Sequence, residues 1–280
     1  PDGYATGVRY AWQASSNNAS WITVAEGGQY LVTRAVAGQQ LRVQASYVDN
    51  LGYLETVTSN ATPTVPLAIV PINGTDGPDV LFGSDFEDEI NGFGDNDSLV
   101  GKGGRDTLTG GSGNDTLIGG AGNDIYLFNA DSALGSDTLN EAGGGTDTLN
   151  FAGTTTAGVT VDLSADSAQT VNANLTLTLG TGANFENVTG GGGNDALTGN
   201  ALVNVLLGGG GNDTLAGLAG NDTLTGGAGN DTYLFDADTV LGTDTLNEAD
   251  GGTDTLDFTG TTTTGITINL GLATVQTVAG

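Results

Sequence analysis

The chain has 280 residues, with 49 glycines, 33 acidic residues, five basic residues and no histidine, cysteine or methionine. Catalysis through an imidazole or a thiol is therefore excluded, and an enzyme would have to work with carboxylates alone. The formal net charge of −28 opposes binding to nucleic acid or to anionic membranes, because both need a surplus of lysine and arginine.

Residues 1–68 differ in composition from the rest, with both tryptophans and only four acidic residues. Apolar and polar residues alternate over residues 8–14 and 41–47, which is typical of strands with one buried face. These strands predict a small β-sandwich. The strings YAWQAS and LRVQASYVDNLGYLETVTS resemble the immunoglobulin-like (Ig-like) repeats of large bacterial surface proteins. We expect the first strand of this domain to lie upstream of Pro1.

Prolines spaced between Pro63 and Pro71 predict an extended linker, after which the sequence repeats every nine residues. Six units run from Gly74 to Leu127, and five more run from Gly190 to Leu234. Positions one, two and four are mostly glycine, position six is aspartate and position eight is apolar, as in GGSGNDTLI. Each unit thus predicts one glycine turn and one short strand, with position eight pointing inward. Two units would form one coil of a flattened solenoid, so that turns of alternate units stack.

The units resemble the calcium-binding nonapeptide of RTX (repeats-in-toxin) proteins, whose consensus is G-G-x-G-x-D-x-U-x. The resemblance implies an all-β fold, a right-handed parallel β-roll or β-solenoid, that binds several Ca²⁺ ions between stacked turns. The metal ligands that we predict are the position-six side chains Asp79, Asp88, Asp97, Asp106, Asp115, Asp124, Asp195, Asn204, Asp213, Asp222 and Asp231.

Elementary chemistry supports a calcium-sized cation in the stacked turns. Stacked carboxylates about 4.8 Å apart repel one another, and a divalent cation between them reverses the sign of that interaction. Zinc prefers sulfur or imidazole, which this chain lacks, and magnesium demands strict octahedral geometry. Calcium accepts carboxylate and carbonyl oxygens. For a single aspartate, the alternative is a turn residue that bonds to its own backbone.

Some units depart from the consensus. Phe86, Asp95 and Leu202 replace the glycine at position four, and Asn204 replaces the aspartate at position six. We expect the corresponding sites to be weak or empty.

A longer module is duplicated, because adding 107 to a residue number maps Asp124 to Asp231 and Phe128 to Phe235. The predicted domains are an Ig-like β-sandwich at 1–68, a first array at 69–128, a wider solenoid connector at 129–189, a second array at 190–235 and a truncated connector copy at 236–280. We expect the aromatic residues Tyr126, Phe128, Tyr233 and Phe235 to fill the core where the coils widen. For the connector residues Asp137, Asp147, Asp244 and Asp254, calcium binding and a plain surface turn remain open.

The sequence favours a non-catalytic, calcium-binding structural segment of a large secreted or cell-surface bacterial protein, such as an adhesin, surface-layer or matrix component. It would stay unfolded in calcium-poor cytosol and fold on Ca²⁺ after export. The alternative is a folding and secretion module of an extracellular enzyme whose catalytic domain lies outside this chain. A third possibility is recognition of sugar or ice by the threonines at 154–156 and 261–264.

Calcium ions are the predicted partners, together with other copies of the chain, surface proteins or polysaccharides. We expect no nucleic acid. A transmembrane segment is also not expected, because no apolar run reaches about eighteen residues.

Overall fold

The computed structural model describes residues 6–27, 39–48, 53–62, 71–141, 143–180, 185–248, 251–263, 265–268 and 270. The chain divides into two compact units, Pro1–Ile69 and Val70–Gly280. The regular secondary structure of the described residues is entirely β-strand, so the all-β prediction is confirmed there. No helix with the length and apolar character of a membrane span occurs in these ranges.

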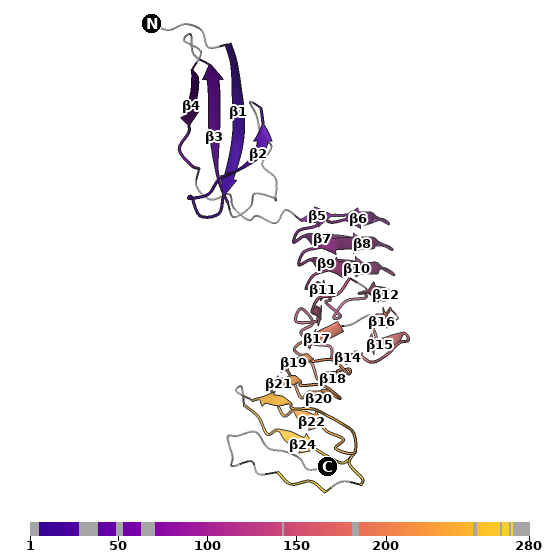
Figure 1. Ribbon diagram of the computed structural model, residues 1–280. Helices are drawn as coiled ribbons and strands as arrows, with labels where there is room; N and C mark the ends of the chain where they lie inside the picture. Colours follow the sequence, from indigo (N-terminus) through magenta and orange to yellow (C-terminus); the bar gives the residue numbers. More distant parts are fainter. Residues whose placement is uncertain are drawn as a thin grey trace. The chain divides into compact units, whose positions relative to one another are not determined.

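The described part of the first unit is one antiparallel sheet with the strand order β2-β1-β3-β4 (Figure 1). Its strands are β1 (Thr6–Ser15), β2 (Ile22–Glu26), β3 (Gln40–Val48) and β4 (Leu54–Thr58). Ala14 pairs with Leu41, and both are buried, whereas Tyr10 on the same strand is exposed. The second sheet of a sandwich is not among the described residues, so the Ig-like β-sandwich stays a prediction.

The second unit is a stack of coils whose strands form three sheets with mainly parallel pairing. The nine-stranded sheet contains β5 (Ile72–Asn73), β7 (Glu89–Gly94), β9 (Thr107–Ser112), β11 (Ile125–Leu127), β13 (Asp147–Asn150), β17 (Phe185–Thr189), β19 (Val205–Gly210), β21 (Thr223–Ala228) and β23 (Thr245–Asn247). The six-stranded sheet contains β6 (Val80–Phe82), β8 (Ser98–Gly103), β10 (Thr116–Ala121), β12 (Gly135–Asn140), β16 (Leu175–Leu179) and β15 (Gln169–Asn172). The five-stranded sheet contains β14 (Thr160–Asp162), β18 (Ala196–Thr198), β20 (Thr214–Ala216), β22 (Thr232–Leu234) and β24 (Thr255–Asp257).

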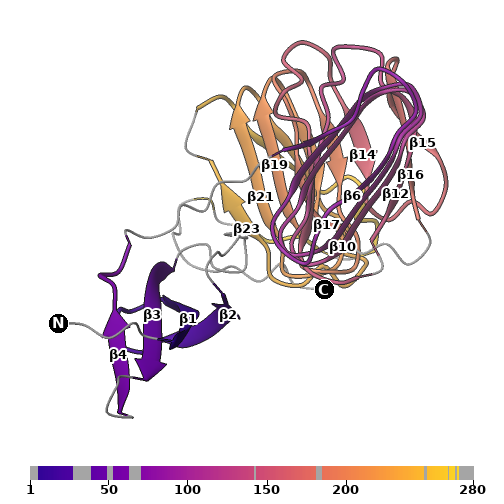
Figure 2. The ribbon, with the colours of Figure 1, turned by 90° about the horizontal axis from the view of Figure 1, so that it is seen from above.

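Within each array, a strand pairs with the strand two units later. Leu99 of β8 lies beside Leu117 of β10, and Leu206 of β19 lies beside Leu224 of β21, in both cases 18 residues apart in sequence. The coils follow one another as layers in Figure 1, and the coils of the first array, drawn in purple, overlap when viewed from above in Figure 2. Two nonapeptides therefore make one coil, as the repeat predicted.

Position-eight side chains form the core of the second unit. Leu99, Leu108 and Leu117 are fully buried, and they belong to one cluster that continues through the connector into the second array. Residues at positions seven and nine of the same strands are less buried, as in the pattern of β8. The apolar position of each repeat thus supplies a column of stacked side chains between the sheets.

The connector between the arrays is more than a set of wider coils. The nine-stranded sheet continues through β13 and β17, but the six-stranded sheet ends in the antiparallel hairpin β15–β16, and the five-stranded sheet begins at β14. Asn172 Oδ1 accepts a hydrogen bond of 2.9 Å from the backbone N–H of Asn174 and so closes the hairpin turn. An Asx turn between two alternating strands explains this departure from the expected solenoid.

Aromatic side chains fill the core at the ends of the arrays, as predicted. Phe128 stacks on Phe151 with a centroid distance of 5.1 Å, and Tyr126 meets the edge of Phe185 at 5.5 Å. In the second copy Tyr233 is buried, and Phe235 is partly buried against the core cluster.

Candidate metal centre

The predicted position-six residues form two ladders in each array, one for each of the two turns of a coil. The backbone N–H of each donates to Oδ1 of the residue one coil later, at distances of 2.7–2.8 Å within the arrays. The ladders join Asp79, Asp97 and Asp115; Asp88, Asp106 and Asp124; Asp195, Asp213 and Asp231; and Asn204 and Asp222. The structure therefore brings all eleven residues into the expected stacks.

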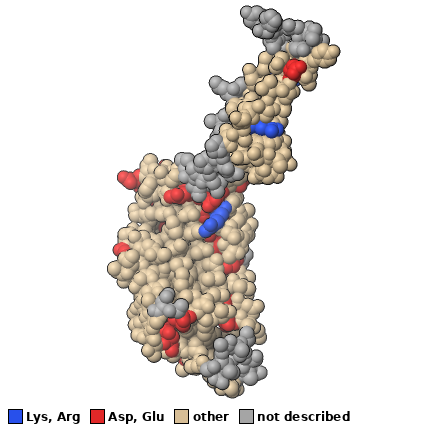
Figure 3. All heavy atoms as spheres, turned by 90° about the vertical axis from the view of Figure 1, so that its left-hand side faces the viewer, with Lys and Arg blue, Asp and Glu red and all other residues tan. Residues whose placement is uncertain are grey.

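Most of these side chains are removed from solvent, although they carry charge. Apart from Asp79, every predicted ligand is buried. Acidic groups appear only as separate patches on the face of the second unit shown in Figure 3. Twelve acidic side chains of the second unit are buried, and any negative charge that they carry requires compensation.

The turns are of two kinds, which differ in whether Oδ2 of the position-six aspartate has a hydrogen-bond partner. In six turns of the described chain, the buried Oδ2 atom has no hydrogen-bond partner. These atoms belong to Asp97, Asp115, Asp124, Asp213, Asp222 and Asp231. In each of these turns, the residue at position two has a positive φ, as in Gly111 at 104° and Gly227 at 102°. This backbone conformation leaves one aspartate oxygen available for a cation.

The first coil of each array has the other kind of turn. Asp79 Oδ2 accepts hydrogen bonds from the backbone and hydroxyl of Thr75, at 2.6 and 2.9 Å. Asp88 accepts the same pair from Ser84, and Asp195 accepts from the backbone N–H of Gly191. These carboxylates satisfy their own turns, which is the alternative that the sequence left open for a single aspartate.

Asn204 is satisfied without a cation as well. Its Oδ1 accepts from the backbone N–H of Asn200 at 2.8 Å, and its Nδ2 donates to the carbonyl of Glu186 at 2.9 Å. An amide here donates a proton to a backbone carbonyl, which a carboxylate cannot do. This geometry supports the expectation that the Asn204 site is weak or empty.

Position-one glycines mark a space bounded by oxygen atoms. A Cβ added to Gly92 would clash with Asp97 Oδ2 and with the carbonyl oxygen of Gly110 in the next coil, and Gly208 meets the equivalent atoms of Asp213 and Gly226. Only glycine keeps this space free of a side chain. Carboxylate and carbonyl oxygens are the ligands that calcium accepts, so the residues present fit the ion.

The raised pKa values of the ladder carboxylates are also consistent with a cation-binding role. Burial, together with the nearby carboxylates of Asp195 and Asp231, raises the pKa of Asp213 to about 7. Burial and the nearby carboxylate of Asp244 raise the pKa of Asp222 to about 6. Burial likewise raises the pKa of Asp115. A bound divalent cation would allow these carboxylates to remain ionised at neutral pH.

The connector aspartates extend the ladders beyond the arrays. The backbone N–H of Asp115 donates to Asp137 Oδ1 at 3.0 Å, and that of Asp124 donates to Asp147 Oδ1 at 2.8 Å. Asp137 and Asp147 are buried, so they are not plain surface-turn residues. In the second copy, Asp244 and Asp254 make the equivalent bonds, both at 3.0 Å, but Asp254 is exposed.

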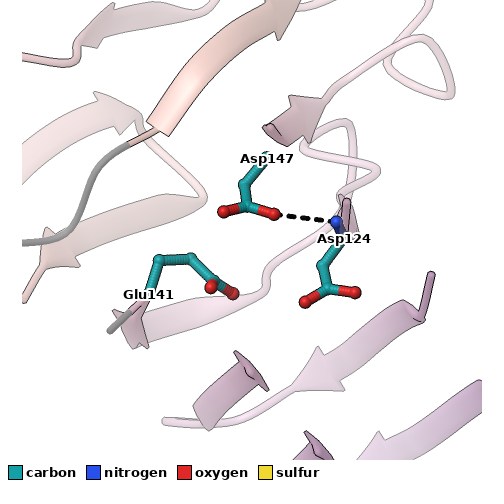
Figure 4. Close-up of side chains that lie close together, drawn as sticks. All are labelled: Asp124, Glu141 and Asp147. Carbon is teal, nitrogen blue, oxygen red and sulfur yellow. Dashed lines mark hydrogen bonds between the residues drawn. The ribbon is translucent and has the colours of Figure 1, made fainter. Parts of the chain in front are cut away.

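Two glutamates that the sequence reasoning missed lie at the ends of the arrays. Oxygen atoms of Asp124, Glu141 and Asp147 lie within 4.8 Å of one another, and Figure 4 shows the three carboxylates gathered around a common space. The second copy groups Asp231 with Glu248 and Asp254. The signal in the sequence was the string TLNEA, which occurs after each array.

Threonines of the two clusters make hydrogen bonds within the chain. The carboxylate of Asp131 accepts hydrogen bonds from the backbone and hydroxyl groups of Thr155 and Thr156, at 2.7–3.1 Å. Asp238 is held in the same way by Thr262 and Thr263. The hydroxyls of these four threonines therefore fix a loop within the chain.

Comparison with known families agrees with this geometry. The sequence model of the RTX calcium-binding nonapeptide repeat, which spans four copies, matches residues 73–108, 100–132 and 207–239. A search of curated proteins found no match. The second unit is thus a stack of mainly parallel sheets whose sequence matches RTX calcium-binding repeats. It also contains two groups of acidic side chains that could hold a metal ion.

Proposed function

We propose that the chain is a calcium-dependent structural segment of a secreted or cell-surface bacterial protein. The observation that supports this most strongly is the set of six stacked, buried aspartates whose Oδ2 atoms have no hydrogen-bond partner. Such a ladder is electrostatically unfavourable in an empty solenoid, whereas calcium ions would neutralise it. We assign the ions to the turns with positive φ at position two, and none to the first coil of each array. These turns include that of Asp97, although the replacement of a glycine by Asp95 predicts a weak or empty site there.

The mechanism is folding coupled to binding. Without calcium, the acidic, glycine-rich chain repels itself and gains little from one apolar residue per repeat, so it stays unfolded. Calcium binds only the folded turns and therefore stabilises them by mass action. A low-calcium cytosol and a calcium-rich exterior would then restrict folding to the time after export.

The role is structural rather than catalytic. The chain has neither histidine nor cysteine, and its buried carboxylates are spread along a ladder. The antiparallel sheet β1–β4 supports an Ig-like domain in the first unit, which would suit an adhesin, a surface layer or a matrix protein. Other copies of the chain, surface proteins or polysaccharides are the partners that such a role requires.

Far-ultraviolet circular dichroism of the full chain tests this proposal. We expect the β signal of the second unit to disappear when calcium is removed with a chelator and to return when calcium is added. Magnesium at the same concentration is the control, and it should restore little of the signal because it demands strict octahedral geometry. The sheet of the first unit should keep its smaller β signal, so a spectrum of the full chain that is unchanged by complete removal of calcium contradicts the proposal.

A further inference from the structure

In the described chain, the last turn of each array has no glycine carbonyl from a following coil beside its aspartate, unlike the internal turns. At Gly101, an added Cβ would meet Asp106 Oδ2 and the carbonyl oxygen of Gly119, one coil later. An added Cβ at Gly119 would instead meet Asp124 Oδ2 and Glu141 Oε1. A glutamate carboxylate therefore stands where the internal turns have a backbone carbonyl.

The second array repeats this substitution. Gly208 faces the carbonyl oxygen of Gly226, whereas Gly226 itself faces Glu248 Oε1 at 2.6 Å from the position of an added Cβ. Glu141 and Glu248 are 107 residues apart, as the duplication requires. The arrangement thus belongs to the module and is not an accident of one loop.

The three carboxylates at the end of the first array are close enough to share one ion. Asp124, Glu141 and Asp147 are at most 2% exposed, and one oxygen of each lies within 4.8 Å of the others. Two oxygens bound to the same calcium at 2.3–2.6 Å can be at most about 5 Å apart. Figure 4 shows that they come from three separate segments of the chain.

The protein orients one oxygen of Glu141 and leaves the other free. Glu141 Oε1 accepts hydrogen bonds from the backbone N–H of Gly119 at 3.1 Å and from the hydroxyl of Tyr126. The Tyr126 hydroxyl in turn accepts from Gly119 N–H at 2.7 Å. Glu141 Oε2 and Asp124 Oδ2 are both buried and have no hydrogen-bond partner. Two unpartnered oxygens in one closed space are an incomplete coordination shell.

We propose that Asp124, Glu141 and Asp147 form a calcium site of a second kind, which closes the first array with a side chain instead of a turn carbonyl. The equivalent residues Asp231, Glu248 and Asp254 close the second array. This inference rests on the proposed function. Because the site has three carboxylates, it binds calcium more tightly than the internal turns do. Tyr126 is a positioning residue that holds the glutamate in place.

The test uses the full chain with Glu141→Gln and Glu248→Gln, singly and together. Glutamine keeps the size of the side chain and an oxygen that can accept from Tyr126, but it removes the charge. We expect each substitution to remove one bound Ca²⁺ from a calcium titration, or to weaken that ion at least about tenfold. Glu55→Gln in β4 is the matched control, because this exposed glutamate lies in the first unit and its loss should change nothing.

Two outcomes of the titration separate the inference from the proposed function. If the wild-type chain binds calcium and the double variant keeps every ion at the same affinity, the closing sites are wrong and the structural role stands. In that case the glutamates act as neutral hydrogen-bonding acids, a role that glutamine can fill. If the wild-type chain binds no calcium, the proposed function itself fails.

A second measurement needs no variant, in case the substituted chains do not fold. Crystals of the wild-type chain grown with terbium, a stand-in for calcium, should show an anomalous peak among Asp124, Glu141 and Asp147. Peaks between the internal turns with none at this position would overturn the inference. Tyr126→Phe adds a check on positioning, since it should weaken the closing ion about tenfold or more while the internal ions are unaffected.

Discussion

Three residues other than glycine occupy position two of turns that require a positive φ. The angle φ is 77° at Phe93, 82° at Lys102 and 68° at Leu218. Side chains in this region of backbone space cost roughly 1–2 kcal/mol each. The repeat therefore tolerates strain at these turns in order to keep the conformation that frees an aspartate oxygen.

Replacement of one strained side chain should stabilise the protein. We expect Leu218→Gly to raise the free energy of unfolding by about 0.5–1 kcal/mol, because the relief of strain exceeds the entropy that glycine costs. Ser84→Gly is the matched change at position two of a first-coil turn. It should destabilise by about 1 kcal/mol or more, since it removes the hydroxyl bond to Asp88. Thermal unfolding at one fixed, saturating calcium concentration measures both, and a loss of stability in Leu218→Gly contradicts the account.

Replacing a glycine at position two of a repeat should have the opposite effect on stability. Gly111 has φ of 104°, and an added Cβ would clash with the carbonyl oxygen of Phe93. We expect Gly111→Ala to cost about 2 kcal/mol or more. Gly103→Ala is the control, because its Cβ would find no atom closer than 3.7 Å, and it should change stability by less than about 0.5 kcal/mol. Equal melting temperatures for the two variants would show that the turn conformation is not restrictive.

The stacking of the position-six side chains could be predicted at the residue scale because the repeat determines it. Register of 18 residues places Asp97 beside Asp115, and the nonapeptide alone determines that register. Glu141 could not be found in this way. It reaches the ladder 22 residues after Gly119, across a turn of different length, and only the folded chain shows that contact.

The strands of the arrays were equally predictable at the scale of the element. A glycine turn, a short strand and one inward apolar residue recur in every unit, so local pattern and global packing agree. The hairpin β15–β16 was not predicted, because an alternating strand has the same pattern whether its neighbour is parallel or antiparallel. In the first unit, alternation indicated strands, but it could not show which face a second layer would cover.

The hydrogen bonds from Thr155 and Thr156 to Asp131 predict how stability changes at acidic pH. Donors from both threonines and from Ala157 lower the pKa of Asp131 in the folded chain. A group with a depressed folded pKa stabilises the fold above its unfolded pKa, about 3.9, and this contribution is lost as the pH falls through the folded pKa. We therefore expect Asp131→Asn to lower the melting temperature at pH 7.

The pH dependence of that difference provides the control. Melting curves of the wild-type chain and of Asp131→Asn, recorded at matched free calcium, should converge as the pH falls below about 4. Calcium release at low pH affects both chains alike and drops out of the comparison. A difference that stays constant over this range would mean that the substitution acts through packing and not through the charge of Asp131.

At the scale of the whole molecule, the charge and the calcium dependence lie in the same unit. The second unit contains all but four of the 33 acidic residues, and its buried aspartates are stacked in register with one another. The sheet of the first unit has no such ladder in its described residues. The two units should therefore differ in their response to calcium, although they belong to one chain.

Hydrogen–deuterium exchange of the full chain, with peptides resolved by mass spectrometry, tests the central claim most directly. With calcium, the backbone amides of the ladder, such as those of Asp97, Asp106 and Asp213, should be strongly protected. With a chelator, they should exchange at the rate of an unfolded chain, while protection of β1 and β3 is unchanged. Ladder amides that remain protected after complete removal of calcium would show that the solenoid stands without its ions, and would contradict the account.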